Sequence, residues 1–191
     1  MDGDGLHAAI NATEQPPLPD DDATRRASVA LVFRPGPDLL MIKRAEHPGD
    51  PWSGHMAFPG GGLEGSETWL DAAIRECWEE LDLRLEDARV LGRLRPVVGP
   101  RLRKSRPTIQ VQPYVFWMPQ VGPLTPNEEV AEVHWFALSR FLQNEGRATF
   151  PFRWRGQELK MPCHRLDGRT IWGMSLSMID DLIDRVRSFS G

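Results

Sequence analysis

Cysteine is scarce in this sequence, and long apolar runs are missing from it. Cys77 and Cys163 are the only cysteines among 191 residues, too few for a disulfide framework. No stretch is long and apolar enough to cross a bilayer, and the N-terminal residues lack the basic start and apolar middle of a secretion signal. We therefore expect a cytoplasmic protein with no membrane partner.

An excess of positive charge is also missing. The chain has 23 Lys and Arg against 27 Asp and Glu, a formal net charge of −4. This balance argues against a nucleic-acid partner, because binding to phosphate backbones needs basic patches. The stretch Arg101–Arg106 is densely basic. It either pairs with an extra phosphate of a substrate or is an ordinary solvated loop, and both interpretations stay open.

The residues that are present fit one domain. A length of 191 residues with 40% hydrophobic residues suffices for one buried core, and there are no internal repeats. Residues 1–25 are polar and include runs of Pro and Asp, which predicts a disordered N-terminal segment. The folded domain is then expected over residues 26–191.

Strands mixed with two substantial helices predict an α/β fold. The expected strands are residues 28–33, 39–44, 90–94, 109–117 and 132–136, with one or two hairpins over 149–172. A short helix is expected near 139–144 and a closing helix over 173–189. Trp135 and Trp172 are interpreted as packing residues.

The run from Thr68 to about Leu81 lacks Gly and Pro and is predicted to form a helix, with Ser66 as its N-cap. Apolar residues recur in it at helical spacing and form one stripe, made of Leu70, Ile74, Cys77 and Leu81. The glutamates at 76, 79 and 80 share an arc away from that stripe.

Like charges at this spacing oppose helix formation, and a cation among them reverses the repulsion. Carboxylate oxygens suit a hard ion such as Mg²⁺, although a solvated acidic face is the alternative. Two neighbours favour the metal site. Arg75 is spaced to hold Glu79 by an ion pair, and Gly60–Gly62 lets the backbone approach a metal or phosphate closely.

The segment from Gly61 to Leu83 resembles the Nudix box, a spaced pattern of two glycines, several glutamates, one arginine and apolar residues. The matching positions are Gly61, Glu67, Arg75, Glu76, Cys77, Glu79, Glu80 and Leu83. Asp82 stands where the family has glycine, and aspartate also tolerates the left-handed conformation that ends such a helix. The resemblance implies the Nudix fold, a mixed β-sheet sandwiched between α-helices, and a hydrolase that cleaves diphosphates with Mg²⁺ or Mn²⁺.

Two further segments resemble the coenzyme A diphosphatases within that family. They are the lead-in from Leu39 to Gly61, which ends in Phe-Pro-Gly-Gly, and the Trp-Gly segment at Ile171–Ser175. The second arginine of the lead-in pattern is missing here. Alternatives therefore stay open: a Nudix enzyme for ADP-ribose or nucleoside triphosphates, or a non-catalytic domain that senses a nucleotide.

These patterns define the candidate site. The expected catalytic residues are Arg75, Glu76 and Glu79, with Glu79 or Glu76 as the general base. The expected metal ligands are Glu76, Glu79, Glu80, Glu129 and, by the resemblance, the Gly60 carbonyl. The expected substrate-binding residues are Arg44, Trp52, Arg103 and Lys104. The partner is a small-molecule diphosphate, and a homodimer stays open as the assembly.

Overall fold

The computed structural model describes residues 1–13, 25–49, 52–99, 108–154 and 156–190. The basic stretch Arg101–Arg106, with Arg103 and Lys104, lies outside these residues. No helix in the described part of the chain is long and apolar enough to cross a membrane.

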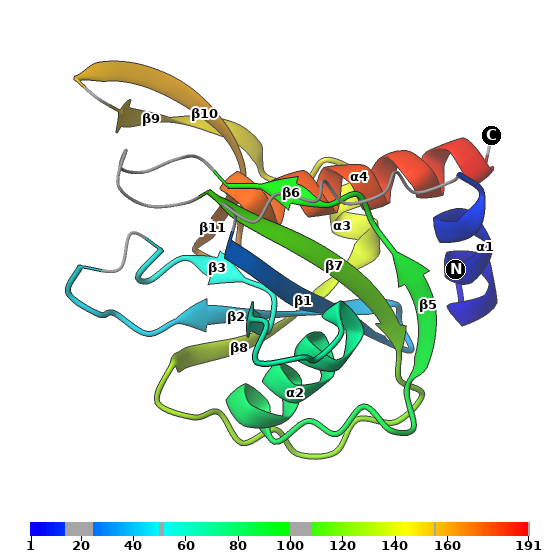
Figure 1. Ribbon diagram of the computed structural model, residues 1–191. Coiled ribbons are helices and arrows are strands. Elements are labelled where there is room, and N and C mark those ends of the chain that lie inside the picture. The colour runs from blue at the N-terminus through cyan, green and yellow to red at the C-terminus, as the bar shows by residue number, and fades with distance from the viewer. Residues whose placement is uncertain (14–24, 50–51, 100–107, 155, 191) are drawn as a thin grey trace.

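The centre of the molecule is a mixed sheet of eight strands (Figure 1). Its main path is β3 (Met56–Ala57), β2 (Asp38–Arg44), β1 (Arg25–Arg34), β7 (Ile109–Trp117) and β5 (Arg89–Arg93). Three more strands pair off this path: β4 (Gly60–Gly62) with β1, β6 (Val97–Val98) with β7, and β8 (Val130–Ala137) with β2. The β1–β7 pair is parallel and the other pairs are antiparallel. The strands expected from the sequence are therefore present.

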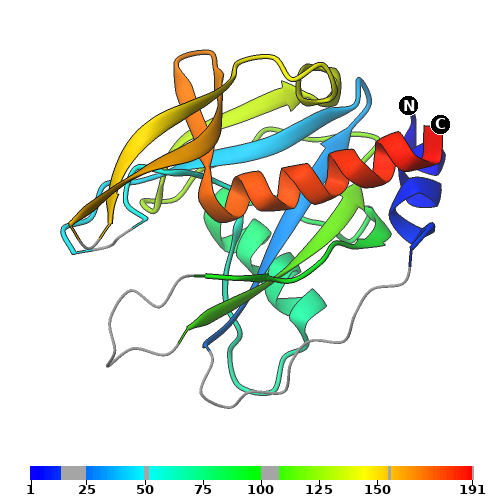
Figure 2. The same ribbon diagram turned by 90° about the horizontal axis from the view of Figure 1, so that it is seen from above.

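Helices cover both faces of this sheet, as Figures 1 and 2 show. On one face lies α2 (Trp69–Leu81), whose Cys77 and Leu81 are fully buried against Ala30 and Val32 of β1. On the other face lie α3 (Leu138–Leu142) and α4 (Gly173–Ser190), whose Leu182 packs in a second apolar cluster. The expected layering of a mixed sheet between helices is confirmed.

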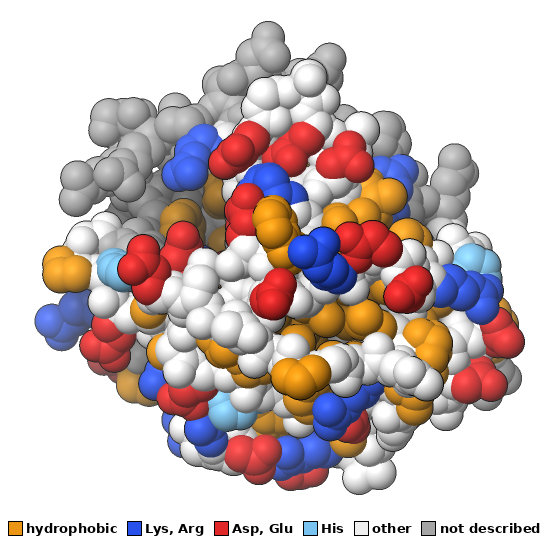
Figure 3. All heavy atoms as spheres, turned by 90° about the horizontal axis from the view of Figure 1, so that it is seen from below, with side chains coloured by type: hydrophobic (Ala, Val, Ile, Leu, Met, Phe, Trp, Pro, Cys, Tyr) orange, Lys and Arg blue, Asp and Glu red, His pale blue; other side chains and the backbone are white. Residues whose placement is uncertain are grey.

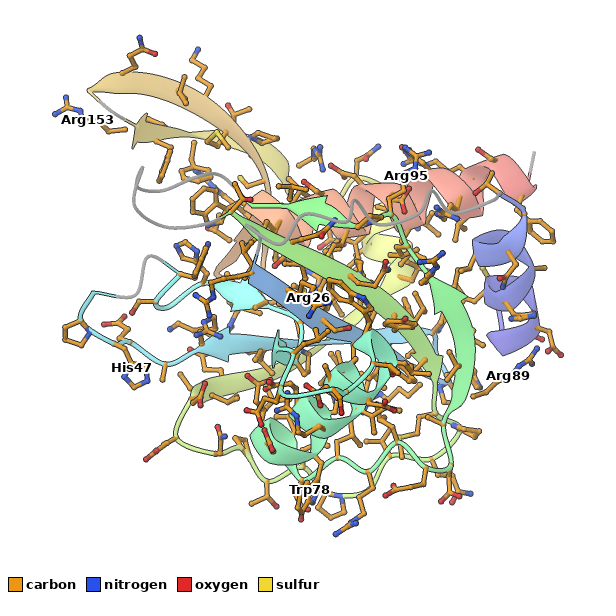
Figure 4. The ribbon with its side chains drawn as sticks, in the orientation of Figure 1. Arg26, His47, Trp78, Arg89, Arg95 and Arg153 are labelled. Atoms are coloured by element: carbon orange, nitrogen blue, oxygen red, sulfur yellow. The ribbon has the colours of Figure 1, made fainter. Side chains whose placement is uncertain are left out.

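A smaller sheet of three antiparallel strands stands beside the first. It consists of β9 (Arg147–Trp154), β10 (Gln157–Leu166) and β11 (Arg169–Trp172), and leads directly into α4. The β9–β10 hairpin projects from the body of the molecule, with Arg153 near its tip (Figure 4). Gly156 and Asp167–Gly168 lie in turns, as expected, and residue 155 lies outside the described residues.

The N-terminal segment differs from the predicted disorder. Gly3–Asn11 forms helix α1, capped by the Asp2 side chain, and Leu6 and Ile10 are fully buried in the core. Arg185 of α4 donates to the Ile10 carbonyl at 2.8 Å. Residues 1–25 are polar on average, so the short amphipathic helix within them was not predicted. Its apolar residues gain their partners from α4 and β5, which are distant in the sequence.

Helix α2 starts later than predicted. Its N-cap is Thr68 rather than Ser66, because Thr68 and Asp71 form a reciprocal capping box. At the other end Asp82 adopts the left-handed conformation with φ 52°, as expected for the residue that replaces glycine. Its N–H donates to the Trp78 carbonyl at 2.8 Å, so the helix ends normally.

Candidate active site

Arg75 of helix α2 connects the residues that precede the helix with the glutamates on the helix. Its guanidinium donates to both carboxylate oxygens of Glu67 at 2.9 and 3.1 Å and to the Gly62 carbonyl at 2.8 Å. It also donates to Glu79 at 2.7 Å and to Glu76 at 3.0 Å. The predicted Arg75–Glu79 ion pair is present, and one planar fork serves two further glutamates. Hydrogen bonding to Arg75 also lowers the pKa of Glu67.

Two glycines of strand β4 leave the space that the neighbouring carboxylate and backbone occupy. A Cβ on Gly61 would lie 2.2 Å from Oε1 of Glu76, so any larger residue would displace that carboxylate. Gly60 has φ 154°, and a Cβ there would lie 2.3 Å from the carbonyl oxygen of Ser28 on the neighbouring strand. Strand β4 therefore places its backbone directly against the carboxylates of α2.

Glu80 is buried, with 3% of its surface exposed. Its Oε2 accepts a hydrogen bond of 3.0 Å from the backbone N–H of Gly60. Burial raises the pKa of Glu80 to about 8, and the negative charges of Glu76 and Glu129 add to that rise. Burial is also the largest cause of the raised pKa of Glu76, with Glu79 and Glu129 adding to it.

Glu129 reaches this group from a distant part of the chain. It lies just before β8, and its carbonyl accepts from the N–H of Ala45 at 2.8 Å, next to Arg44. Glu132, also considered from sequence, lies in a different network with Lys43, His134 and Arg169. Hydrogen bonds from that network lower its pKa to about 2.

Glu76, Glu79 and Glu80 share one arc of helix α2 as predicted, but their carboxylates have different partners. Among the described residues, no three His, Cys, Asp or Glu side chains converge as a metal-binding group. The reason is local: Arg75 holds Glu76 and Glu79, while the Gly60 N–H turns Glu80 inward. The donor chemistry nevertheless fits a hard divalent cation, because every donor is a carboxylate oxygen and burial with mutual repulsion opposes ionisation of Glu76 and Glu80.

A cavity of about 660 Å³ adjoins strand β4. The residues of Gly60–Gly62 line it, as do the predicted substrate residues Arg44 and Trp52. Arg25 and Arg26 line it too, at the start of β1, and were missed from sequence. The guanidinium of Arg26 also lies 6.0 Å from the centre of the Trp69 ring. Basic side chains thus border a cavity whose glycine wall adjoins the glutamates.

Trp172 was also missed as a cavity residue. It lines the cavity and contacts His55 edge-on, with ring centres 4.9 Å apart. The packing interpretation was incomplete, because β11 brings this residue beside the loop before β3. Its place in the Trp-Gly resemblance was the sequence signal for a role near the substrate. Trp135 instead packs against Arg34, whose guanidinium lies 4.3 Å from the ring centre.

The face that carries α2 is not basic. Seen from below, acidic and basic side chains lie interspersed among apolar ones, with no continuous basic patch over its described residues (Figure 3). Trp78 projects from the outer side of α2 (Figure 4) and carries the guanidinium of Arg84 5.5 Å from its ring centre.

Comparison with known families identifies the class of protein. A family model described as NUDIX domain matches residues 23–154. The fold and the site, taken with this match, are those of a hydrolase that cleaves diphosphate bonds, a class that generally uses divalent metal ions. The chain belongs to the NUDIX domain family and is a Nudix diphosphatase.

Relatives and solved structures agree with this assignment. The chain is 29% identical to an uncharacterized Nudix hydrolase NudL of Enterobacter sp. (strain 638) over 172 residues, covering 88% of this chain and 86% of that one. It is 29% identical to NudL of Yersinia pestis (strain Pestoides F) over 198 residues, covering 96% of each chain.

Two solved structures share the fold. The NUDIX domain of Shewanella oneidensis NrtR complexed with ADP ribose has a TM-score of 0.54 at 16% identity, covering 90% of this chain and 91% of that one. The MutT protein of Methanosarcina mazei Go1 has a TM-score of 0.52 at 16% identity, covering 87% and 93%. The Nudix fold expected from the box is confirmed.

Proposed function

We propose that this diphosphatase hydrolyses a nucleotide-linked diphosphate with Mg²⁺ or Mn²⁺, and that coenzyme A is its substrate. One observation carries the proposal. Glu76 and Glu80 of α2 lie against Gly61 and Gly60, the negative charge of Glu129 acts on both, and the same glycines line a cavity bordered by Arg25, Arg26 and Arg44. Negative groups for a cation and positive groups for phosphates thus both adjoin one strand.

Each carboxylate has a separate role in this proposal. Glu76, Glu80 and Glu129 hold the cation together with the Gly60 carbonyl, because they share one electrostatic environment. Glu79 is 45% exposed and held by Arg75, so it serves as the general base that accepts a proton from the attacking water. When bound, the cation offsets negative charge on the diphosphate oxygens.

Two features support the coenzyme A assignment. The lead-in Leu39–Gly61 contributes Arg44, Trp52 and the glycines to one cavity, so the segment resembling that subgroup lies in the candidate site. Trp172 of the Trp-Gly segment lines the same cavity from the far end of the chain. Arg25 and Arg26 are the described basic residues available to the ribose 3′-phosphate of coenzyme A.

ADP-ribose is the second candidate substrate, because the solved NrtR NUDIX domain that shares this fold is complexed with ADP ribose. A panel of coenzyme A, ADP-ribose and nucleoside triphosphates, assayed with Mg²⁺ and with Mn²⁺, separates the two. We expect the highest kcat/KM on coenzyme A, and a clear loss on its 3′-dephospho form. A higher kcat/KM on ADP-ribose would replace the coenzyme A assignment.

A further inference from the structure

The cavity has a second, apolar part beyond its glycine wall. Four methionines from three elements line it: Met56 of β3, Met161 of β10, and Met174 and Met178 of α4. Leu159 of β10 lies in the same wall. Methionine is flexible and polarizable, so a wall rich in it adapts to a chain of variable shape.

Most of this wall is built by residues that follow the matched family domain, namely Leu159, Met161, Met174 and Met178, whereas Met56 lies within it. The NUDIX model ends at residue 154, whereas β10, β11 and α4 follow it. The β9–β10 hairpin and the start of α4 stand over the end of the main sheet in Figures 1 and 2. The C-terminal segment thus adds a feature to the common domain, at the site where a substrate would extend from the diphosphate.

The mouth of the apolar part exposes hydrophobic surface. Val98 of β6 is 56% exposed and Leu159 is 39% exposed, and both line the cavity. Polar groups on this wall have partners within the protein: the Ser175 hydroxyl donates to the Met56 carbonyl at 3.0 Å. Exposed apolar residues at a cavity mouth are typical of a ligand-binding groove.

An aromatic base is a poorer fit to this wall than a flexible chain. Trp172, one of the aromatic residues that line the cavity, is already packed by its own protein. Its ring centre lies 4.9 Å from that of His55 and 5.0 Å from those of Phe150 and Phe152. These contacts make Trp172 part of a fixed wall, rather than an open platform for stacking.

We propose that the apolar part of the cavity binds an aliphatic chain attached to the diphosphate substrate, and that the C-terminal segment 157–178 supplies this specificity. The proposal rests on the proposed function in one respect, because the chain must be carried by a diphosphate held at Gly60–Gly62. Leu159 and Val98 act at the mouth, where a longer chain leaves the cavity.

The test measures binding without turnover. The full chain, treated with a chelator, is titrated by calorimetry with methyl, hexyl and decyl esters of ADP. We expect affinity to rise about two- to fourfold per methylene until the chain passes the mouth, because each methylene leaves water. Equal affinity for all three esters would overturn the proposal. Failure of the chain to hydrolyse any diphosphate with metal would instead overturn the proposed function.

Two variants test where in the cavity the aliphatic chain of the ligand binds. Leu159→Asn and Val98→Asn should each weaken decyl-ADP about fivefold and leave methyl-ADP unchanged. The matched control is Val90→Asn on β5, which is 40% exposed and lies outside the cavity lining. Equal behaviour of Leu159→Asn, Val98→Asn and the control would also overturn the proposal.

A last comparison distinguishes two chemical types of aliphatic chain in the ligand, acyl and isoprenoid. Geranyl-ADP and decyl-ADP have equal carbon number, but the first is branched and isoprenoid. Tighter binding of decyl-ADP indicates an acyl-type substrate, and tighter binding of geranyl-ADP an isoprenoid one. Weaker binding of both than of methyl-ADP would contradict an aliphatic site.

Discussion

Arg75 makes more side-chain contacts at the site than charge neutralisation alone requires. It contacts Glu67, Glu76, Glu79 and the Gly62 carbonyl with one planar group. We predict that Arg75→Lys lowers kcat at least about tenfold, because lysine has no fork to bridge these acceptors. Steady-state kinetics on the best substrate of the panel measures this.

The comparison variant is Arg75→Ala, which also removes the charge. If Arg75→Lys retained the parent kcat while Arg75→Ala lost it, charge alone would suffice and the positioning role of Arg75 would be wrong. Arg84→Lys is the control, because Arg84 is exposed beside Trp78 and outside the site.

A substitution at Glu80 is predicted to lower the activity without lowering the stability. Glu80→Gln keeps an oxygen that accepts from the Gly60 N–H, while removing a carboxylate that burial disfavours. We predict that kcat falls at least about a hundredfold, equivalent to about 2.7 kcal/mol of transition-state stabilisation. The urea midpoint measured with chelator should stay equal or rise.

Glu86 is exposed, so Glu86→Gln is the matched control and should change neither kcat nor the urea midpoint. A large drop in the urea midpoint of Glu80→Gln would mean that the ionised carboxylate is needed for folding. That result would remove the argument that Glu80 is kept for a cation.

At the scale of elements, helix α1 is a structural addition remote from the cavity. It packs on α4 and β5 at the end of the molecule where both termini lie (Figure 2), and none of its residues lines the cavity. We predict that Leu6→Ala costs about 2–5 kcal/mol of unfolding free energy, because Leu6 is fully buried. Its kcat/KM should equal that of the parent.

Asp4→Ala is the control on the same helix. Asp4 pairs with Arg89 at the surface beside α1 (Figure 4), and an exposed ion pair contributes little. Urea denaturation compares the two variants. Equal, small effects of both would show that α1 contributes little to the core.

Glu132 ties three strands together through charge. It accepts from Lys43 of β2, His134 of β8 and Arg169 of β11, which lowers its pKa from 4.5 to about 2. A depressed folded-state pKa stabilises the protein above pH 4.5, and that contribution is lost as pH falls toward 2. We predict that Glu132→Gln is less stable than the parent at pH 7.

The difference between Glu132→Gln and the parent should shrink as pH drops from about 4.5 toward 2. Urea midpoints at a series of pH values measure it, with the exposed Glu128→Gln as control. A deficit that is the same at pH 7 and pH 3 would assign the effect of Glu132 to packing rather than to its charge.

At the scale of the whole molecule, a cation at the carboxylate site should stabilise the fold. A ligand at about one hundred times its Kd adds about 2.7 kcal/mol, which corresponds to roughly 5–10 °C in Tm for a chain of this size. We predict that Mg²⁺ or Mn²⁺ raises the Tm of the parent and that chelation abolishes its activity. Calorimetric scans of the parent and of Glu80→Gln compare the two.

The variant's Tm should respond to metal by less than about a third of the parent's shift. An identical Tm response in Glu80→Gln would move the cation elsewhere. Activity that survives exhaustive chelation would exclude the metal-dependent reaction altogether.

Features that depend on neighbours in the chain were predictable from the sequence. The stripe of Cys77 and Leu81, the Arg75–Glu79 pair and the left-handed Asp82 all follow from spacing within one helix. The N-cap was predicted two residues early, because Ser66 and Thr68 are both good caps and only Thr68 is answered by Asp71. Such errors arise where two local signals compete.

Features that depend on distant segments were predictable only in part. Glu129 was chosen because acidic residues precede a strand, but its closeness to Glu76 and Glu80 comes from the β2–β8 pairing. The burial of Leu6 and Ile10 was missed, because nine helical residues gain stability only by tertiary packing, here on α4 and β5. Trp172 enters the cavity only because β11 precedes α4 beside β3.

The sequence by itself determined the carboxylate helix, its arginine, the glycine run before it and the class of chemistry, since periodicity, capping and side-chain type act over a few residues. The tertiary structure alone decided that Glu80 is buried with a pKa near 8, that Gly61 lies against Glu76, and that the C-terminal segment makes an apolar wall. Desolvation and contact depend on which distant segments exclude water together, and only the folded chain sets that.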